Sequence, residues 1–574
     1  MEKKFSKQFR RSQHVLLRLP VILAALALLS LPKFIIPPAA ATPPQFQIGF
    51  QAEPQPLSGP DVDSLSAQAA IPNDSEMIPL ESSAAPSLDE VVKPESLDND
   101  LEPPVFNVEP DYSEHTSLAR KIDAILSRSS VQRGFWGVEV YSISDGALLY
   151  SHNGDKHFSP ASNVKVFTTA AALDRLGADF RFETPVAYEG TLSADGELSG
   201  DLVLFGRGDP DLAGKLEADK EMFENLDLIA QKIKEAGIRE VSGDIIGDDS
   251  YFWFSPYGKG WKLTDLNHYY GAPVSALSFM DNTAQIRAFA AGKIGHPARL
   301  YSWPTSFMDI ENKTRTVRSK SKNTLHFARP MGSKLQVGGQ VPHGTKNWTL
   351  TIPVDNPALY TASIFRDRLE KAGVEIKGEA KSRHYGGTSN VQSTTVYVHR
   401  SLPLIEIISY INKKSQNLYA EILLRTLGAE LKDEGTDFGG IQVVYEFLQE
   451  AGIGQEMVEL HDGSGLSRLN LITPRAETLL LAELSNRHYF PLFWESLSIS
   501  SRDGTLKNRM KKTSAAQRVH GKTGTLDEVS TLGGYVETQS GRTLAFAILL
   551  NNYNFSYWTA RKTFDEICGV LAKY

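Results

Sequence analysis

The stretch HGKTGTLDEVSTLGGYVETQSGRTLAFAILL, residues 520–550, decides the fold of this chain. Its apolar runs 532–538 and 543–550 predict a strand pair. The Gly-Lys-Thr near its start is typical of a phosphate-binding loop, but that motif needs a glycine where Ala516 stands. Because predicted strands follow in the sequence, we expect 520–525 to be a strand as well.

Working outward from this stretch, helical and strand patterns alternate along the chain. Between residues 183 and 395 short β-runs and Gly-rich turns predominate. A hairpin is predicted where Asp145-Gly146 separates 136–142 from 147–150. Apolar periodicity and stop signals predict helices at 117–128, 162–176, 226–236, 362–372, 403–412, 418–430 and from about 556 onward.

The composition excludes several classes of protein. The 574 residues are 41% apolar and 22% charged, which excludes a wholly disordered chain, a fibrous protein and a multi-span membrane protein. The single cysteine, Cys568, excludes an intramolecular disulfide framework and a Cys-rich metal site. The net charge of −8 arises in the first 115 residues. Residues 116–574 are neutral overall. They lack the positive electrostatic field that binding of nucleic acid requires, so we expect no nucleic-acid partner. The histidines have no metal-ligand spacing, so we expect no metal site.

Residues 1–41 follow the order of a secretory signal. Six basic residues between Lys3 and Arg18 precede the apolar run Val21–Leu31 and the small residues 39–41. An uncleaved anchor is the alternative, but only 14 uncharged residues lie between the basic group and Lys33. A membrane-spanning helix needs about 20. In both cases we expect the body to be exported to the periplasm or cell envelope.

Residues 42–115 have the composition of a tether. They hold 12 prolines and a net charge of −14, and such a segment cannot bury enough apolar surface to order itself. We expect a disordered, self-repelling linker. Its role stays open between a spacer near a membrane or wall, with peripheral association there, and a linker without a dedicated partner.

Ser162-Asn163-Val164-Lys165 is the first of three short motifs that carry chemistry. On a helix, positions i and i+3 share a face, so the hydroxyl and the amine can meet. The helix N-terminus stabilises negative charge that develops there, and burial of Lys165 would favour the neutral amine that acts as a base. The same pattern at Ser30/Lys33 and Ser319/Lys322 is better explained by flanking charge and a solvated turn.

Ser415-Gln416-Asn417 is the second motif, between two predicted helices. Residues two apart do not share a helix face, so a joint role requires a turn. In a turn the Ser415 hydroxyl could pass a proton and the Asn417 amide could hold a substrate carbonyl. An ordinary polar helix cap is the alternative. Ser321/Asn323 also fits the pattern.

The third motif lies in the predicted strand 520–525. Period-two alternation puts the Thr523 and Thr525 hydroxyls on one face, where they could hold a terminal carboxylate together with Lys522. The neighbouring glycines would let an extended substrate approach the backbone and add to the sheet edge. A Gly-rich strand entry without chemistry is the alternative.

Taken together, the order S-x-x-K, S-x-N, K-T-G resembles the constellation of penicillin-binding proteins and β-lactamases. Ser162 and Ser415 are 253 positions apart, and Ser415 and Lys522 are 107 positions apart. These separations resemble those found in one group of these proteins. This group is the low-molecular-mass class C penicillin-binding proteins, the D-Ala-D-Ala carboxypeptidase/endopeptidase family. The resemblance covers about 116–574, and it includes LVLFGRGDPDL (202–212), GDIIGDDSYF (243–252), YYGAPVSALSFMDN (269–282), DGSGLSRLNLITP (462–474) and RDGTL (502–506).

The resemblance implies an α/β (α+β) fold. A β-lactamase/transpeptidase-like domain, with an antiparallel sheet flanked by helices, would be formed by 116–182 and 396–574. The mostly-β region 183–395 would be inserted into this domain as more than one subdomain, where it would bind glycan or a partner, or shape the cleft.

The resemblance also implies a role for each matching residue. Ser162 would attack the D-Ala-D-Ala carbonyl, Lys165 would take its proton, and the backbone N–H groups of Ser162 and Thr525 would form the oxyanion hole. Ser415 would relay a proton to the leaving D-Ala, with Lys522 tuning that step. The substrate would be bound by Asn417, Thr523, Gly524 and Thr525, with 462–465 beside the cleft either in support or as a loop without chemistry.

The resemblance thus implies a serine-type D-Ala-D-Ala carboxypeptidase, with endopeptidase activity open, that acts on peptidoglycan stem peptides and is inhibited covalently by penicillins and other β-lactams. No cofactor is implied, because nucleophile, base and oxyanion donors are all protein groups. Two alternatives remain: a β-lactamase, which would deacylate fast, and a catalytically inactive peptidoglycan-binding homologue.

Overall fold

The computed structural model describes residues 112–329, 334–385 and 392–574. The predicted export segment 1–41 lies outside the described residues, and so does the predicted linker except for its last four residues. Those four belong to helix α1, Tyr112–Leu126, which begins five residues before the predicted helix.

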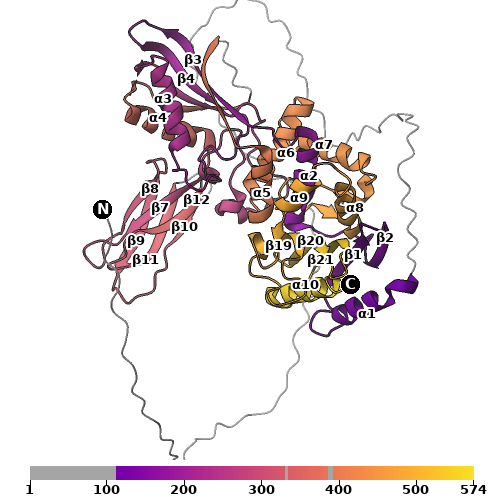
Figure 1. Ribbon diagram of the computed structural model, residues 1–574. Coiled ribbons are helices and arrows are strands. Elements are labelled where there is room, and N and C mark those ends of the chain that lie inside the picture. Colours follow the sequence, from indigo (N-terminus) through magenta and orange to yellow (C-terminus); the bar gives the residue numbers. More distant parts are fainter. Residues whose placement is uncertain (1–111, 330–333, 386–391) are drawn as a thin grey trace, which may run out of the picture. The chain divides into compact units, whose positions relative to one another are not determined.

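An antiparallel sheet of six strands combines the N-terminal hairpin of the described residues with strands from the C-terminal part of the chain (Figure 1). Its strand order is β18-β19-β20-β21-β1-β2, so the N-terminal hairpin extends a sheet whose middle comes from the C-terminal stretch. The strands are β1 Phe135–Ser142, β2 Ala147–His152, β18 Ser498–Ile499, β19 Val519–Leu526, β20 Val529–Glu537 and β21 Thr543–Asn551. The predicted strand 520–525, the predicted strand pair and the predicted hairpin are therefore confirmed.

Both faces of this sheet are covered by helices. In β21 the buried Phe546 and Ile548 belong to the core under α1 and α10 (Tyr557–Leu571), while Ala545 and Leu549 belong to the core on the opposite face. That second face holds α2 Val164–Leu176, α5 Leu404–Lys414, α6 Asn417–Lys432, α7 Asp437–Glu450, α8 Pro474–Leu484 and α9 Phe490–Ser496. Burial on both faces explains why the run AFAILL is almost continuously apolar.

The region between β3 and β15 is mostly β-structure with two helices. A seven-stranded sheet is built from β3 Glu183–Leu192, β4 Glu197–Phe205, β5 Glu240–Val241, β6 Ile245–Asp248, β13 Glu375–Ile376, β14 Ala380–Arg383 and β15 Ser393–Arg400. Helices α3 Glu224–Glu235 and α4 Pro357–Ala372 pack against it. Two three-stranded sheets follow, β7 Thr283–Phe289 with β8 Arg299–Trp303 and β12 Trp348–Pro353, and β9 Ile310–Val317 with β10 His326–Ala328 and β11 Leu335–Pro342.

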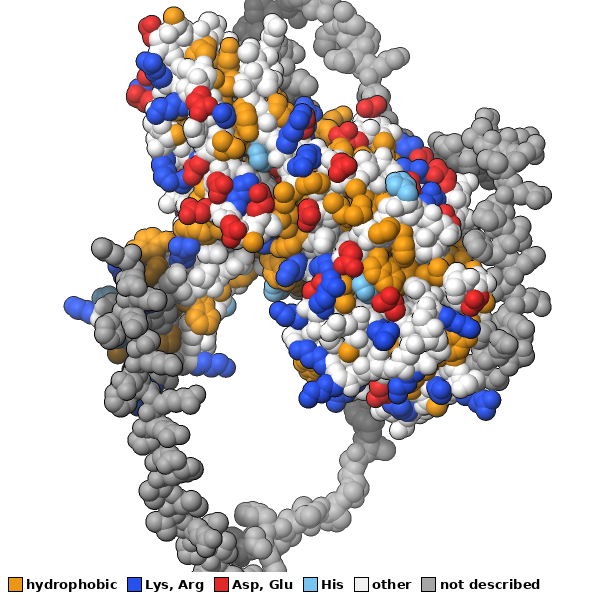
Figure 2. Space-filling model, viewed as in Figure 1, with side chains coloured by type: hydrophobic (Ala, Val, Ile, Leu, Met, Phe, Trp, Pro, Cys, Tyr) orange, Lys and Arg blue, Asp and Glu red, His pale blue; other side chains and the backbone are white. Residues whose placement is uncertain are grey.

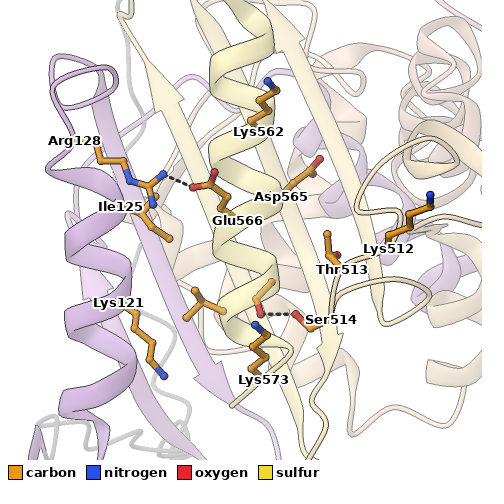
Figure 3. A pocket seen from close by; sticks show the side chains of 12 residues that line it. Lys121, Ile125, Arg128, Lys512, Thr513, Ser514, Lys562, Asp565, Glu566 and Lys573 are labelled. Atoms are coloured by element: carbon orange, nitrogen blue, oxygen red, sulfur yellow. Dashed lines mark hydrogen bonds and ion pairs between the residues drawn. The ribbon is translucent and has the colours of Figure 1, made fainter.

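The surface carries charges of both signs. Figure 2 shows cationic and anionic side chains interspersed over the visible face. A cavity of about 780 Å³ lies between α1, α10 and residues 512–514, where Lys121 and Lys573 project into it and Arg128 pairs with Glu566 across it (Figure 3). None of the predicted site residues lines this cavity. Within the described residues, no helix is long and apolar enough to cross a membrane.

Candidate active site

Ser162 and Lys165 meet at the start of α2, although not in a single helical turn. Residues 161–163 form a short 3-10 helix, and α2 begins only at Val164, two residues later than predicted. Ala161 adopts a left-handed backbone (φ 46°) just before the serine. The Ser162 Oγ nevertheless lies 3.0 Å from the Lys165 Nζ. Ser162 is half-buried and Lys165 is completely buried.

The surroundings of Lys165 favour a neutral amine. Burial lowers its pKa from 10.5 to about 7, although the nearby Asp462 and Glu421 act in the opposite direction. Besides Ser162, its Nζ contacts the Asn417 Oδ1 at 2.7 Å and the Ser464 carbonyl oxygen at 2.5 Å. These two oxygens can only accept hydrogen bonds, so they take the two N–H groups of a neutral amine. A neutral amine then has its lone pair left for the Ser162 hydroxyl, whose oxygen lies 3.0 Å away.

Ser415 and Asn417 lie at the turn that the motif requires. Ser415 ends α5 in the left-handed conformation (φ 59°, ψ 43°), and Asn417 is the first residue of α6. This turn lets both side chains face the same site. The Lys522 Nζ donates to the Ser415 Oγ at 2.7 Å. The Asn417 Nδ2 donates to the Tyr270 carbonyl at 2.9 Å, so a loop of the inserted region holds this amide.

Strand β19 passes directly beside the serine. A Cβ on Gly524 would lie 2.9 Å from the Ser162 nitrogen and 2.8 Å from the Pro160 oxygen, so the strand approaches this closely only because residue 524 has no side chain. Lys522 and Gly524 are buried on one face of the strand, while Thr525 is exposed. The Thr523 Oγ1 donates to the Thr505 Oγ1 at 2.8 Å.

A cavity of about 370 Å³ opens in front of the serine. Ser162, Asn417 and Thr525 line it, so the structure brings one residue of each motif to the same space. Gly465 and Tyr270 also line it, the first from the 462–465 loop and the second from the inserted region. The inserted region therefore forms part of the cleft wall.

The 462–465 loop is fixed by two buried carboxyl groups. Glu421 accepts the N–H groups of Gly463 (3.0 Å) and Ser464 (2.8 Å), and burial raises its pKa to about 8. Asp462 accepts the Gly465 N–H at 2.8 Å. This network holds the Ser464 carbonyl against Lys165. Sequence reasoning missed Glu421, and the only signal was a carboxylate one helical turn after Asn417, within the mostly apolar run 418–424.

Two residue pairs of the inserted region, Ser319/Lys322 and Ser321/Asn323, match the first two motif patterns but lie away from this cavity. Ser319 and Lys322 are exposed in the turn after β9, and Ser321 and Asn323 lie in the same segment. The Ser30/Lys33 pair lies outside the described residues.

The arrangement of three motifs around one cavity can be compared with known proteins. Residues 118–574 match the family model described as the D-Ala-D-Ala carboxypeptidase 3 (S13) family. The chain belongs to the S13 family. A D-alanyl-D-alanine carboxypeptidase of Actinomadura sp. (strain R39) is 35% identical over 474 residues, which cover 80% of this chain and 85% of that protein.

Two further comparisons are with proteins of Haemophilus influenzae. Its D-alanyl-D-alanine carboxypeptidase DacB is 28% identical over 424 residues, covering 72% of this chain and 84% of that protein. The crystal structure of its penicillin-binding protein 4 (dacB) matches with a TM-score of 0.68 and 26% identity, covering 79% of this chain and 99% of that one. The same protein has been solved in complex with a β-lactam, at a TM-score of 0.64. These matches confirm the predicted fold class and the resemblance to class C penicillin-binding proteins.

Proposed function

We propose that this S13 enzyme removes the terminal D-Ala from peptidoglycan stem peptides through an acyl-enzyme on Ser162, and that β-lactams acylate the same hydroxyl. The activity is that of its family and relatives, D-alanyl-D-alanine carboxypeptidases. The observation that carries the assignment of the nucleophile is the 3.0 Å contact between Ser162 Oγ and a buried Lys165 whose other two partners are pure acceptors.

In the acylation step, the Ser162 oxygen attacks the carbonyl carbon of the penultimate D-Ala and its proton passes to the Lys165 Nζ. The negative charge that develops on the carbonyl oxygen is stabilised by the backbone N–H groups of Ser162 and Thr525, which β19 brings together at Gly524. The C–N bond then breaks, and Ser415 gives a proton to the amine of the leaving D-Ala.

Lys522 supports this proton transfer and the binding of the substrate carboxylate. Its ammonium donates to the Ser415 Oγ, so it replaces the proton that Ser415 gives away. Its charge also attracts the C-terminal carboxylate, which Thr523 and Thr525 would bind with their hydroxyls. After D-Ala leaves, the proton that Lys165 took from Ser162 passes to Ser415 and Lys522, so Lys165 is neutral again. Water then hydrolyses the ester: its oxygen attacks the acyl carbon, Lys165 takes a proton from the water and gives it to the Ser162 oxygen, which leaves as the hydroxyl.

Peptidoglycan lies outside the cytoplasm, so we place this activity in the cell envelope. Cleavage of residues 1–41, the association with membrane or wall and the division into domains stay predictions. So does the balance between carboxypeptidase and endopeptidase activity.

The test of this proposal is release of free D-Ala from an N-acylated tripeptide ending in D-Ala-D-Ala. We expect the wild-type chain to release one D-Ala per peptide and Ser162→Ala to release none, while Ser319→Ala, which changes the serine of the exposed Ser319/Lys322 pair, keeps the wild-type rate. Equal release by wild type and Ser162→Ala would contradict the assignment of the nucleophile. No release by the folded wild type would contradict the activity.

A further inference from the structure

Glu477 is a buried carboxyl group that the steps above do not use. It lies in the first turn of α8 and has no exposed surface. Its Oε1 accepts the Asn163 Nδ2 at 2.8 Å, and Asn163 follows the nucleophile in the chain. The Asn163 Oδ1 in turn accepts from the Thr531 Oγ1 at 3.0 Å. Among the described residues, the Glu477 Oε2 has no hydrogen-bond partner.

The sheet register places this carboxyl group next to the Lys522 side chain. Gly533 of β20 pairs directly with Lys522 of β19 in an antiparallel ladder. Side chains directly opposite each other in such a ladder lie on the same face, with Cα atoms about 5 Å apart. A Cβ on Gly533 would lie 2.0 Å from the Glu477 Oε1. Glu477 therefore fills the space that the cross-strand neighbour of Lys522 would occupy.

Stability does not explain a carboxyl group in this position. A buried polar atom without a hydrogen bond costs free energy, and a buried ionised group costs more. Accordingly, burial raises the pKa of Glu477 to about 8, against the opposing effect of Lys522. Groups that are costly for the fold and lie beside reacting residues are candidates for a functional role.

Lys522 requires a negative charge nearby if it is to stay protonated. It is completely buried, and both its burial and the nearby Lys165 lower its pKa well below the ordinary value. A neutral Lys522 could neither attract a carboxylate nor replace the Ser415 proton. Glu477 is the group that raises the pKa of Lys522.

We propose that Glu477 is a positioning residue of the carboxypeptidase reaction, which acts through Lys522 as its counter-charge on the sheet face behind the substrate strand. The proposal rests on the proposed function of Lys522. As pH rises, Glu477 ionises and the charge pair keeps a proton on Lys522, while Lys165 gives up its proton to serve as the base.

The other charged groups around this pair have different partners. Lys165 of α2 faces Lys522 on one side and Asp462 and Glu421 on the other. Glu139 of β1 also lies against α8, where it pairs with Arg475 (3.4 Å). Glu477 is thus the carboxyl group that acts on Lys522 directly.

The experiment is the pH profile, from pH 6 to 10, of the acylation rate of the full chain by a fluorescent penicillin. In Glu477→Gln the Oε1 acceptor for Asn163 remains, but the charge is gone. We expect the alkaline decline of the profile to move to lower pH by about one unit or more, the size of effect that a neighbouring charge has. At pH 9 this corresponds to an acylation rate roughly tenfold below wild type. The melting temperature should be unchanged or higher, because a buried carboxyl group whose Oε2 has no hydrogen-bond partner among the described residues is removed.

Two further variants make this test specific. Glu477→Asp keeps the charge and should keep the alkaline decline close to that of wild type. Glu139→Gln changes a buried acid of β1 that pairs with Arg475 of α8, away from Lys522, and should leave the profile in place, even if it lowers the melting temperature. The proposal is overturned if the Glu477→Gln profile coincides with wild type, if its rate falls by the same factor at every pH, or if Glu477→Asp shifts the profile equally. Absence of acylation in wild type would instead contradict the proposed function.

Discussion

At the scale of single residues, the proposed acylation of Ser162 depends on one proton on Lys165. The amine is completely buried, and two of its three polar contacts are with oxygens that cannot donate. Only the neutral amine can accept the Ser162 proton, and burial brings its pKa to about 7. The protonation of Lys165 therefore couples acylation to pH in the neutral range.

We predict that the acylation rate rises as pH increases through about 7 and reaches a plateau before the alkaline decline that depends on Lys522. Below this pH Lys165 holds a proton and cannot act as a base, so the rate should fall about tenfold per pH unit. Stopped-flow or gel-based acylation with a penicillin between pH 5 and 8 measures this limb. A rate that stays constant over that range, or that keeps rising toward pH 10, would contradict a depressed lysine pKa.

At the scale of elements, the turn that carries Ser162 is shaped by Gly465, a glycine of a loop that is distant in the sequence. Gly465 has φ +80°, and a Cβ there would lie 1.8 Å from the Ala161 oxygen, one residue before the nucleophile. The loop can therefore support this turn only with glycine at that position. Gly452, after α7, has a similar φ of +74° but no atom within 4 Å of the same Cβ position.

These two glycines form a matched pair of variants. Gly465→Ala should displace the Ser162 turn and lower the acylation rate by about 100-fold, the cost of misplacing reacting groups by about 1 Å. Gly452→Ala carries the same backbone strain, so it should lower stability by about 1 kcal/mol and leave acylation unchanged. Equal acylation rates in the two variants, measured with melting temperatures, would show that the contact with Ala161 does not position the nucleophile.

The loop after β4 contains another buried acid, whose contribution to stability depends on pH. Asp209 accepts the Asp211 N–H at 2.9 Å through Oδ1, while its Oδ2 lacks a hydrogen-bond partner in the described part of the chain. Burial raises its pKa to about 7. The folded state therefore keeps a proton that the unfolded chain loses near pH 4, so this group lowers stability progressively as pH rises from about 4 to 7.

Asp209→Asn should remove that dependence. The amide keeps the Oδ1 acceptor and never ionises, so the variant should gain stability over wild type by about 2 kcal/mol between pH 5 and pH 8. Thermal or urea unfolding of both proteins at these two pH values measures the gain. An advantage of the variant that is equal at pH 5 and pH 8 would mean that Asp209 is ionised throughout this range and would contradict a raised pKa.

At the scale of the whole molecule, the parts of the fold that local patterns specify could be predicted from the sequence. The strand pair before the C-terminal helix, the hairpin at Asp145-Gly146 and the helix that ends at Gly177 each have apolar periodicity and a stop signal. Residue order and spacing also separated the three motifs from the similar patterns at Ser319 and Ser321, and one residue of each motif lines the same cavity. Their catalytic roles stay predictions.

What local patterns could not predict is set by tertiary contacts. Helices α7, α8 and α9 were not predicted from the sequence. Glu421 and Glu477 look like ordinary helix residues, and their burial beside Lys165 and Lys522 follows only from how α6 and α8 pack on the sheet. The contribution of Tyr270 to the cleft likewise could not be predicted, because it depends on the path of the inserted loop in the folded chain.

The central claim is that Ser162 is the acylated nucleophile of a slowly deacylating carboxypeptidase. Intact mass spectrometry of the full chain after incubation with a penicillin, beside Ser162→Ala, tests it most directly. We predict a long-lived adduct of one penicillin mass on the wild type and none on the variant. Hydrolysed penicillin without a lasting adduct would instead indicate a β-lactamase, and a folded wild type with neither adduct nor hydrolysis would contradict the catalytic account.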